Sequence, residues 1–498
     1  MFGKFKTLLG HTLIYGLGNY GIKIIGFLLI PLYTRYLSPE DYGVMALISM
    51  YTQALFVLMN LGQSVTLFRF YYERDTEEHR ERVVAASLWI VLLVAIPISS
   101  LPLGFSTEIS EWLTGTGAWW LLVAIGTGTV LAKILLRMPF SIMRAGDQSK
   151  RYAIWSLLRN GLATGLALGF VAVLHMGATG VILSQFVGEF IMCLLLIGTT
   201  LRMLRSGFRW GDIKEQLVFG LPLVPAGIAA FALDLADRWF LRTYHNVEDV
   251  GIYSLGYRFG EIITFVVTAF QLSWPQFLFS HRKEPNAPQL YSQMTSYYLA
   301  ILAFLWLGLA AFSPELIAIM APPTYAAATA IVPIVALAMC LDGVTFMINI
   351  GPPFFKRTIL RTYTICTAAV INLGLNFLLI PKYGAIGAAW ATFFGFLVQA
   401  IMTFILSRRL YPVAYEWTRL GIVVASAGGV YGATFAVAGD DLFFRLFIKS
   451  FLVIAYPAAL LYCGFFETSD LITACGVVER RSPAAARVLR RLLPGVPA

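Results

Sequence analysis

The sequence predicts an all-α polytopic membrane protein with about 14 transmembrane helices, and three observations lead to that prediction. Of its 498 residues, 58% are hydrophobic and only 13% are charged, with a mean hydropathy of +0.74. A soluble domain carries about 25% charged residues. The chain also holds many apolar runs of about 20 residues, the length that crosses a bilayer as a helix. No connection between these runs is long enough to form a separate domain.

Fourteen runs are predicted as membrane spans. Their approximate limits are 12–34, 40–62, 83–105, 117–137, 152–174, 178–200, 216–241, 250–275, 292–312, 326–350, 361–380, 384–406, 419–438 and 443–464. The first run is too long for a cleavable signal and lacks an Ala-x-Ala end, so we take it as a span. The seventh contains Pro222 and Pro225, which predict a broken helix or a simple kink.

Lys and Arg residues gather on one side of these spans. With the N-terminus in the cytoplasm, the inward segments hold 27 of the 37 Lys and Arg residues and the outward loops hold three. Because cytoplasmic loops carry an excess of Lys and Arg, both termini are predicted to be cytoplasmic. The net charge of +10 reflects this bias and contact with anionic lipids more readily than nucleic-acid binding. The segment 466–498 is expected to be a basic amphipathic helix on the membrane or a disordered tail.

Two windows recur at nearly the same offset. "RYLSPEDYGVMAL" from Arg35 matches "TYHNVEDVGIYSL" from Thr243 at five of thirteen positions, 208 residues later. "GATGVILSQFVG" from Gly177 matches "GAIGAAWATFFG" from Gly384 at five of twelve, 207 residues later. The offset covers six spans, an even number, so both copies face the same way across the membrane. This predicts two parallel six-helix lobes, 1–205 and 206–410, around a central cleft, with two extra helices in 411–465.

Ionisable groups inside spans are candidate functional residues, because each costs several kcal/mol in hydrocarbon. Lys23 lies about 16 Å into the first span at the rise of an α-helix, near the middle of the bilayer. Asp237 and Arg258 flank a short outer loop and are expected at similar depth. They form either a buried structural ion pair or part of an anion site in which Arg258 and Lys23 face the cleft.

Other charged residues in the spans are given no role. Lys133, Arg159 and Arg445 lie near predicted span ends, from which long side chains reach water. Glu189, Asp342 and Lys449 lie deeper and have no evident partner in the sequence.

Two asparagines, Asn372 and Asn376, lie one helical turn apart in the apolar run "INLGLNFLLIPKYGAIGAA". Amide oxygens are good ligands for a hard cation once a carboxylate joins them. Asp237 and Thr392 are candidates to complete such a site. The alternative is that the amides only join helices, at about 0.6 kcal/mol for each hydrogen bond.

Three segments carry the motifs of a known family. They are "LGNYGIKIIGFLLIPLYTRYLSPEDYG", "DRWFLRTYHNVEDVGIYSLGYRFGE" and "INLGLNFLLIPKYGAIGAAWAT". They resemble polysaccharide flippases of the Wzx type, in the multidrug/oligosaccharidyl-lipid/polysaccharide exporter superfamily. The resemblance covers the first twelve spans in order. It implies alternating access in a bacterial inner membrane. The implied substrate is an oligosaccharide on undecaprenyl diphosphate, moved to the outer leaflet for exopolysaccharide or O-antigen synthesis.

The resemblance also implies site residues. In related lipid II flippases, basic residues of the first and eighth spans contact the diphosphate, and Lys23 and Arg258 match those positions. Arg238 and Glu261 complete the expected substrate-binding set. These relatives hold sodium through an Asp in the seventh span and polar residues in the eleventh and twelfth. The residues that fit this pattern are Asp237, Asn372, Asn376 and Thr392.

One departure from that pattern concerns the coupling ion. The second ligand in the eleventh span is acidic in those relatives and is the neutral Asn376 here. Weaker sodium binding is therefore expected, and proton coupling through Asp237 or Glu261 is an alternative. No cofactor is expected.

Three other classes of protein fit the sequence less well. A drug/cation antiporter of the same superfamily needs an acidic cleft, and Lys23 and Arg258 argue against it. A membrane polymerase or glycosyltransferase needs a catalytic set, usually on a sizeable outer loop, and the five His residues form no cluster in the sequence. A scaffold of a synthase would leave the buried charges and the repeat unexplained. We therefore expect a transporter and not an enzyme, with a polysaccharide polymerase and chain-length proteins as candidate partners and no nucleic acid.

Overall fold

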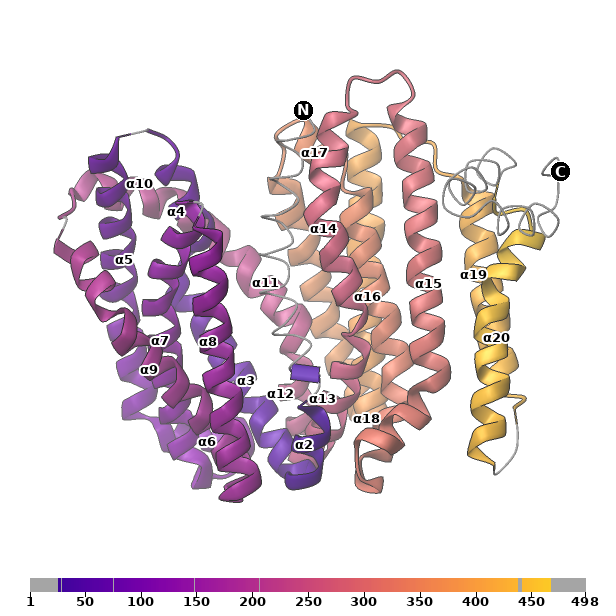
Figure 1. Cartoon of the computed structure of the whole chain (residues 1–498), viewed down its shortest axis with the longest axis horizontal. Coiled ribbons are helices and arrows are strands. Elements are labelled where there is room, and N and C mark those ends of the chain that lie inside the picture. Colours follow the sequence, from indigo (N-terminus) through magenta and orange to yellow (C-terminus); the bar gives the residue numbers. More distant parts are fainter. Residues whose placement is uncertain are drawn as a thin grey trace. The chain divides into compact units, whose positions relative to one another are not determined.

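The computed structural model of the protein describes residues 26–27, 29–74, 76–146, 148–205, 207–437 and 441–466 (Figure 1). These residues form helices joined by short connections, with no strand among them. In chain order the helices are α2 Ile30–Tyr36, α3 Pro39–Asn60, α4 Gln63–Tyr71, α5 Glu77–Gly104, α6 Ser106–Thr114, η1 Gly117–Trp119, α7 Trp120–Ala145, α8 Ser149–Ala167, η2 Leu168–Val173, α9 Gly177–Arg205, α10 Trp210–Gly220, η3 Leu221–Leu223, α11 Val224–Leu235, α12 Asp237–Tyr244, α13 Val247–Gly260, α14 Ile263–Ser280, α15 Ala287–Met320, η4 Pro323–Ala330, α16 Ile331–Ile348, α17 Gly351–Phe354, α18 Ile359–Leu410, α19 Trp417–Thr434 and α20 Leu442–Tyr462.

The number of long apolar helices confirms a polytopic all-α membrane protein. In the described part of the chain, ten helices are long and apolar enough to cross a membrane, or eleven if α13 and α14 count as one. The predicted total of 14 is consistent with this, because the first predicted span, 12–34, lies mainly outside the described residues and α18 contains two predicted spans.

The two predicted spans at 361–380 and 384–406 are the two arms of α18, which folds back at Gly384. The backbone there has φ 54° and ψ −132°, a left-handed conformation that glycine adopts without a steric penalty. A Cβ atom placed on Gly395 would lie 3.0 Å from the Cβ of Asn372. In one straight helix these residues would be about 35 Å apart at 1.5 Å per residue, so the arms are antiparallel.

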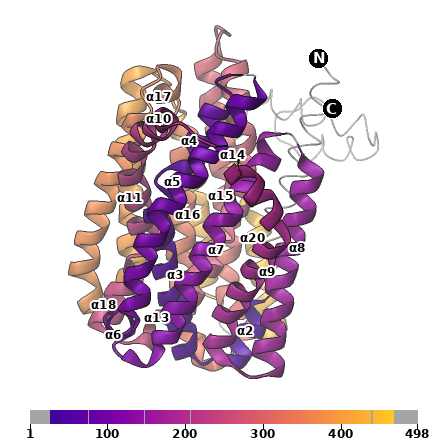
Figure 2. The same ribbon diagram turned by 90° about the vertical axis from the view of Figure 1, so that its left-hand side faces the viewer.

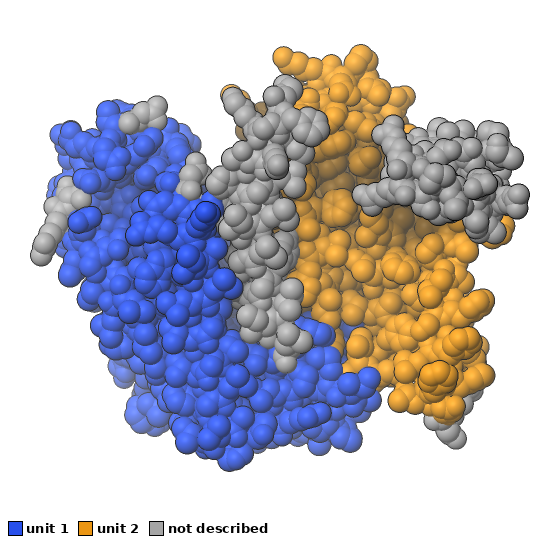
Figure 3. Space-filling model, viewed as in Figure 1, with its two compact units in different colours: residues 1–258, 317–335, 358–402 blue, residues 259–316, 336–357, 403–498 orange. Residues whose placement is uncertain are grey.

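The helices group into two compact units, which Figure 3 colours blue and orange. The first unit comprises residues 1–258, 317–335 and 358–402. Within it, α7 packs against α3, α5, α8 and α9, and Figures 1 and 2 both show α5, α7 and α9 running side by side. Leu88 and Val91 of α5 and Val130 and Ile134 of α7 belong to an apolar cluster that joins these two helices.

The second unit comprises residues 259–316, 336–357 and 403–498. Its apolar cluster joins α15 to α19 and α20 through Leu307, Val423, Val453 and Tyr456. Other large apolar side chains of α20 point outward, such as Phe443, which is 78% exposed, as expected for a helix that faces lipid. These units follow helix packing. The predicted lobes, 1–205 and 206–410, and the segment 411–465 were divided by the sequence repeat instead, and these boundaries stay a prediction.

The repeat is visible as a pair of equivalent helix contacts within the first unit. A Cβ atom on Gly43 would lie 1.9 Å from the carbonyl oxygen of Val247, and one on Gly251 would lie 1.9 Å from that of Pro39. The repeat offset of 208 relates Pro39 to Val247 and Gly43 to Gly251. Each glycine therefore contacts the equivalent of the other glycine's partner, as in an isologous interface. The starts of α3 and α13 therefore cross so closely that only glycine fits at either crossing point.

The ends of equivalent helices are also alike. Ser38 caps α3, because its hydroxyl accepts a hydrogen bond from the backbone N–H of Asp41 at 3.1 Å. Asn246, its equivalent, accepts one from the N–H of Asp249 at 2.7 Å. In the second repeated window, Gly177 and Gly384 have φ values of 58° and 54°. The two copies therefore share local backbone geometry as well as sequence.

Candidate functional site

The carboxylate of Asp237 lies at the centre of a buried polar cluster in the first unit. Its side chain is 1% exposed. Oδ1 accepts hydrogen bonds from the backbone N–H of Arg238 at 2.8 Å and from its guanidinium at 3.0 Å. Oδ2 accepts one from the hydroxyl of Tyr253 and a longer one, of 3.4 Å, from Thr392. The predicted association of Asp237 with Thr392 is therefore present in the structure.

The helix that leads to the cluster is interrupted twice, and the two prolines account only for the first interruption, a short 3-10 turn within the span Trp210–Leu235. Helix α10 ends at Gly220, a short 3-10 turn follows, and α11 begins at Val224 with Pro225 in its first turn. A second break at Ala236 separates α11 from α12, so Asp237 opens a new helix. Backbone N–H groups in a first turn have no partner within the helix, and the N–H of Arg238 is one of them. The breaks thus supply one of the donors to the carboxylate.

The predicted asparagine pair is fully buried and hydrogen-bonded to itself. Asn376 Nδ2 donates to Asn372 Oδ1 at 3.1 Å, and neither side chain is exposed. The remaining polar atoms, Asn372 Nδ2 and Asn376 Oδ1, have no hydrogen-bond partner among the described residues. A buried amide oxygen without a donor is costly, because its desolvation is not offset.

Packing around α18 brings this pair close to the level of the carboxylate. A Cβ atom on Gly395 would lie 2.7 Å from Leu233 Cδ1 and 3.0 Å from Asn372 Cβ, so these three residues share one level. Near the end of the hairpin, His245 contacts the carbonyl oxygen of Ile380 at 2.8 Å, so α12 and both arms of α18 reach the same end. From the level of Leu233, Gly395 and Asn372, one helical turn towards that end leads to Asp237, Thr392 and Asn376. The four predicted cation-site residues thus fall within two adjacent turns.

Arg258, predicted to bind the anionic part of the substrate, has a different environment from the one expected. It is half-buried on α13, and its guanidinium carbon lies 5.6 Å from the centre of the Tyr42 ring. Among the described residues no carboxylate pairs with it. The interpretation of Asp237 and Arg258 as an ion pair is therefore wrong, because Asp237 pairs with Arg238.

The physical reason for this correction is depth. Asp237 precedes His245 in the connecting loop by eight residues, whereas Arg258 follows it by thirteen. At 1.5 Å per residue, Arg258 lies about 7.5 Å deeper along its helix than the level of Asp237. Tyr253 follows His245 by eight residues and is the residue that meets the carboxylate. Equal distance from the loop was the signal that could have identified Tyr253, which the sequence reasoning missed.

The other predicted substrate-binding residues are placed as follows. Arg238 is 6% exposed, and besides its bond to Asp237 it lies 4.6 Å from the centre of the Tyr257 ring. Glu261 is exposed at the break between α13 and α14. Lys23 lies outside the described residues. The substrate-binding roles of these residues stay predictions.

Two buried carboxylate–cation pairs correct the expectation that Glu189 and Lys449 lack partners. Arg159 of α8 donates to both carboxylate oxygens of Glu189 on α9, at 2.5 and 2.8 Å. Lys449 of α20 donates to Glu315 of α15 at 2.7 Å within the second unit. The partners could not be found from sequence, because they lie on helices 30 and 134 residues away whose rotation depends on packing.

Comparisons with known proteins identify the fold. The structure is similar to that of a lipid II flippase MurJ in its inward closed conformation, with a TM-score of 0.73 and 13% identity over 90% of this chain and 99% of that one. It is similar to a MATE transporter with a TM-score of 0.57 and 16% identity over 84% and 97% of the two chains. The chain therefore has the fold of these transporters, as the sequence motifs predicted.

Two curated relatives match most of the chain. The succinoglycan biosynthesis transport protein ExoT of Rhizobium meliloti is 22% identical over 82% of this chain and 78% of that protein. A probable low-salt glycan biosynthesis flippase, Agl15 of Haloferax volcanii, is 21% identical over 76% and 81%. The model of the polysaccharide biosynthesis protein family matches residues 8–275. With more than half of its length matched by that model, the chain belongs to the polysaccharide biosynthesis protein family, in agreement with the resemblance to Wzx-type flippases.

Proposed function

We propose that the protein is a flippase that moves an oligosaccharide linked to polyprenyl diphosphate from the cytoplasmic to the outer leaflet of a bacterial inner membrane. Family membership and the transporter fold support movement of a lipid-linked glycan. The observation that carries the choice of an anionic cargo is Arg258. It is a half-buried cation in an apolar helix, and no carboxylate among the described residues neutralises it. Such a group is costly in a membrane unless an anion binds it.

The physical task is to carry a sugar head group and a diphosphate through about 30 Å of hydrocarbon. Alternating access would provide a polar path for the head group while the polyprenyl chain stays in lipid. Outward movement of negative charge is favoured where the cytoplasm is negative, by about 2.3 kcal/mol per charge for each 100 mV. Cytoplasmic termini, as the Lys and Arg distribution predicts, are part of this proposal.

A drug/cation antiporter is the second candidate, because the MATE transporter shares the fold. It would need free acidic groups to hold a cationic drug. The buried carboxylates of Asp237, Glu189 and Glu315 are each paired with a cation of the protein itself. This pairing favours the glycan flippase.

Coupling to a cation is also a proposal, and the structure bears on which cation fits. Both oxygens of Asp237 accept two hydrogen bonds each, and Arg238 neutralises its charge. Asn376 Oδ1 is the one buried oxygen of the predicted set without a donor among the described residues. A metal cation needs several free oxygen ligands, so the residues as arranged do not fit sodium. A proton needs only one lone pair, and it would have to displace only the 3.4 Å hydrogen bond from Thr392. We therefore propose Asp237 as a proton-coupling residue and derive no step through sodium.

The test is the location of lipid-linked sugars in cells that lack the protein. Polyprenyl-diphosphate oligosaccharides would be labelled in intact spheroplasts with an impermeant sugar-oxidising enzyme and compared with the total after lysis. We expect finished units to accumulate on the cytoplasmic side and to be released by the wild-type gene. Arg258→Gln should release at most a tenth as much, whereas Arg151→Gln, which removes an exposed arginine, should match the wild type. Units that reach the outer face without the protein would refute the proposal and point to a polymerase or scaffold.

A further inference from the structure

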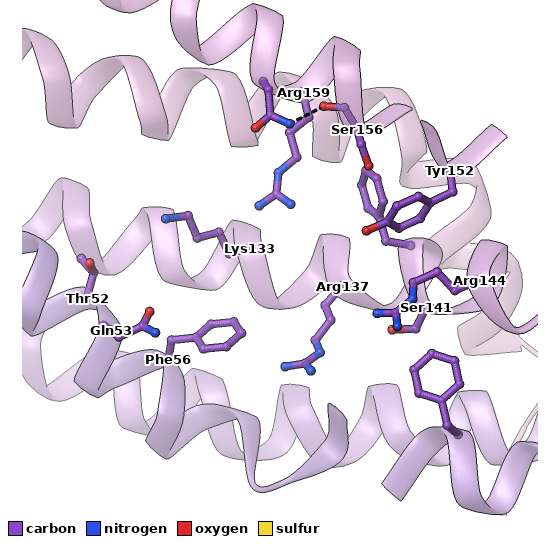
Figure 4. A pocket seen from close by; sticks show the side chains of 13 residues that line it. Thr52, Gln53, Phe56, Lys133, Arg137, Ser141, Arg144, Tyr152, Ser156 and Arg159 are labelled. Carbon is purple, nitrogen blue, oxygen red and sulfur yellow. Dashed lines mark hydrogen bonds between the residues drawn. The ribbon is translucent and has the colours of Figure 1, made fainter. Parts of the chain in front are cut away.

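A cavity inside the first unit is lined by four cations that the proposed function has not used. It has a volume of about 500 Å³ and lies between α3, α4, α7 and α8. Figure 4 shows side chains from these helices directed into a shared space, with Arg159 opposite Lys133 and Arg137. A volume of roughly 300–1,000 Å³ is typical of ligand pockets. The four cations are Lys133, Arg137, Arg144 and Arg159.

Three of these cations form a stripe on α7. Lys133, Arg137 and Arg144 are separated by four and seven residues, spacings that return to the same face of a helix. The helix continues to Ala145, eight residues beyond the predicted end of the span at 137. Lys133 therefore lies near the middle of α7 and lines a cavity, whereas the sequence placed it four residues from the end of a span.

The cavity holds more positive charge than the carboxylates of the described residues neutralise. Glu189 pairs with Arg159, and it is the only carboxylate among the described residues within ion-pair distance of any of the four cations. Arg137 is held by the side-chain oxygen of Asn60, which carries no charge. The amine of Lys133 forms no hydrogen bond or ion pair with any described residue. Lys133, Arg137 and Arg144 thus have no carboxylate within ion-pair distance among the described residues.

Aromatic rings hold two of these guanidinium groups in place. The guanidinium carbon of Arg137 lies 5.5 Å from the centre of the Phe56 ring, and that of Arg144 lies 5.1 Å from the centre of the Phe68 ring. Contacts of this kind stabilise a cation by about 0.5–2 kcal/mol and leave its N–H donors available. Because arginine presents these donors in a fixed fork, it matches the oxygen pairs of a phosphate.

The remaining wall is polar and suits hydroxyl groups. Thr52 and Gln53 of α3 line one side, and Ser156 and Asn160 of α8 line the other. Asn160 donates to the backbone oxygen of Ser156 at 2.6 Å, which fixes its amide. Tyr152 adds an aromatic face at the same wall. Neutral donors and acceptors beside an aromatic ring form a surface that a sugar can bind.

We propose that this cavity is a binding site for a phosphate- or diphosphate-bearing head group, separate from Arg258, with room for the first sugar attached to it. The site requires only residues of the first unit. Its assignment to the diphosphate of the carrier lipid rests on the proposed function, whereas anion binding itself does not. The same chemistry could come from the carrier, from an anionic phospholipid or from free pyrophosphate, and the experiment separates these sources.

The first measurement is calorimetric binding of inorganic pyrophosphate to the full-length protein in neutral detergent at low salt. We expect saturable binding that weakens as salt rises, because the ligand is held by charge. Lys133→Gln/Arg137→Gln should weaken binding at least tenfold. The matched control, Lys150→Gln/Arg151→Gln, removes the same charge from exposed positions at the start of α8 and should stay within twofold of the wild type. Lys133→Gln alone removes no hydrogen bond or ion pair with a described residue, so it should change the melting temperature little and still weaken binding several-fold.

Competition then identifies the source. If competition shows that undecaprenyl diphosphate binds at least tenfold more tightly than pyrophosphate, the carrier is the ligand. Displacement by phosphatidylglycerol nanodiscs, and not by phosphatidylcholine nanodiscs, assigns the site to a membrane lipid. If neither lipid displaces pyrophosphate, the site is assigned to free pyrophosphate. Equal binding by the wild type, the pocket variant and the control variant would overturn the proposal, as would absence of binding by the folded wild type. These readouts need no transport, so they stand even if the flipping assay fails.

Discussion

The two copies of the repeat share a backbone frame but differ in the chemistry that they hold. In the first copy, Lys133, Arg137 and Arg159 line the cationic cavity. An offset of 208 takes these positions to Leu341, Thr345 and Thr367, none of which is charged. An offset of 207 also gives uncharged residues. The cationic cavity is thus a property of the first copy alone.

The reverse holds for the buried polar cluster of the second copy. Subtracting 208 from Asp237 gives Leu29, and subtracting 207 from Asn372 and Asn376 gives Gly165 and Gly169. The crossing glycines, the helix caps and the left-handed glycines are alike in both copies. We propose from this difference that the cationic cavity of the first copy binds an anion and that the polar cluster of the second copy couples transport to an ion, while Arg258, also in the second copy, contacts the cargo.

The largest effect is expected from the shared frame. Gly43→Ala and Gly251→Ala would each place a Cβ atom 1.9 Å from a backbone oxygen of the other copy. Overpacking costs about 1–3 kcal/mol and occasionally more, and a backbone oxygen at this distance cannot give way as a side chain does. Both variants should lose most of the folded protein, as measured by fluorescence-detected size-exclusion chromatography after heating. Gly161→Ala on α8, where a Cβ atom meets open space, is the control and should melt like the wild type. Equal melting of all three variants would show that the copies do not cross as described.

The next effect concerns the cluster of the second copy. Asp237→Asn keeps the shape of the side chain and removes the charge that Arg238 neutralises. We expect transport in proteoliposomes to fall at least tenfold and to lose its response to a pH gradient. Pyrophosphate binding should stay within twofold of the wild type. A loss of pyrophosphate binding that matches the loss of transport would break the separation between the two copies.

A smaller effect is expected from the pair that adjoins the cavity of the first copy. Arg159→Gln leaves the carboxylate of Glu189, which is 9% exposed, without its partner. Arg159 is itself 31% exposed, so water screens part of the loss, and we expect a destabilisation of about 2 kcal/mol. The double variant Arg159→Gln/Glu189→Gln should recover much of the melting temperature. If the two single losses simply add in the double variant, the residues are not coupled.

The smallest effect should come from Thr392→Val. Its hydroxyl makes the longest of the four hydrogen bonds to Asp237, at 3.4 Å, while the other three remain. A typical hydrogen bond contributes about 0.5–1.5 kcal/mol, and this one lies at the lower end. We expect transport to fall no more than threefold, with an unchanged melting temperature. Tyr253→Phe removes a hydroxyl that donates to the same oxygen of Asp237, and it should lower transport further. The opposite order would mean that Thr392 contacts the coupling ion directly.

Features that depend on composition or on the backbone could be predicted from the sequence. The membrane class, the repeat and the boundary between the spans 361–380 and 384–406 were predicted correctly. Near Pro222 and Pro225, where the sequence left a break and a kink open, the helix has a 3-10 turn. Each follows from local residue types, because hydropathy, proline and glycine act on the segment that contains them.

Side-chain pairings could not be predicted in the same way. The partner of Asp237 was Arg238, its neighbour in sequence, and the cations of the cavity come from two helices whose rotation depends on packing. A shift of five residues in depth was enough to misplace Arg258. The stripe on α7 was readable from its spacing, but the predicted span ended at 137, eight residues before the end of the helix, so the stripe was not read as one set.

The most direct test of the account is a flipping assay with purified protein in proteoliposomes. Undecaprenyl-diphosphate oligosaccharide would be placed in the inner leaflet, and its arrival in the outer leaflet would be followed with an impermeant sugar-oxidising enzyme. The account predicts rapid transfer by the wild type. Lys133→Gln/Arg137→Gln should raise the half-saturating substrate concentration, and Asp237→Asn should lower the maximal rate and remove the response to a pH gradient. Transfer no faster than in protein-free liposomes, under conditions where the wild type is folded, would contradict the central claim that this protein is a lipid-linked glycan flippase.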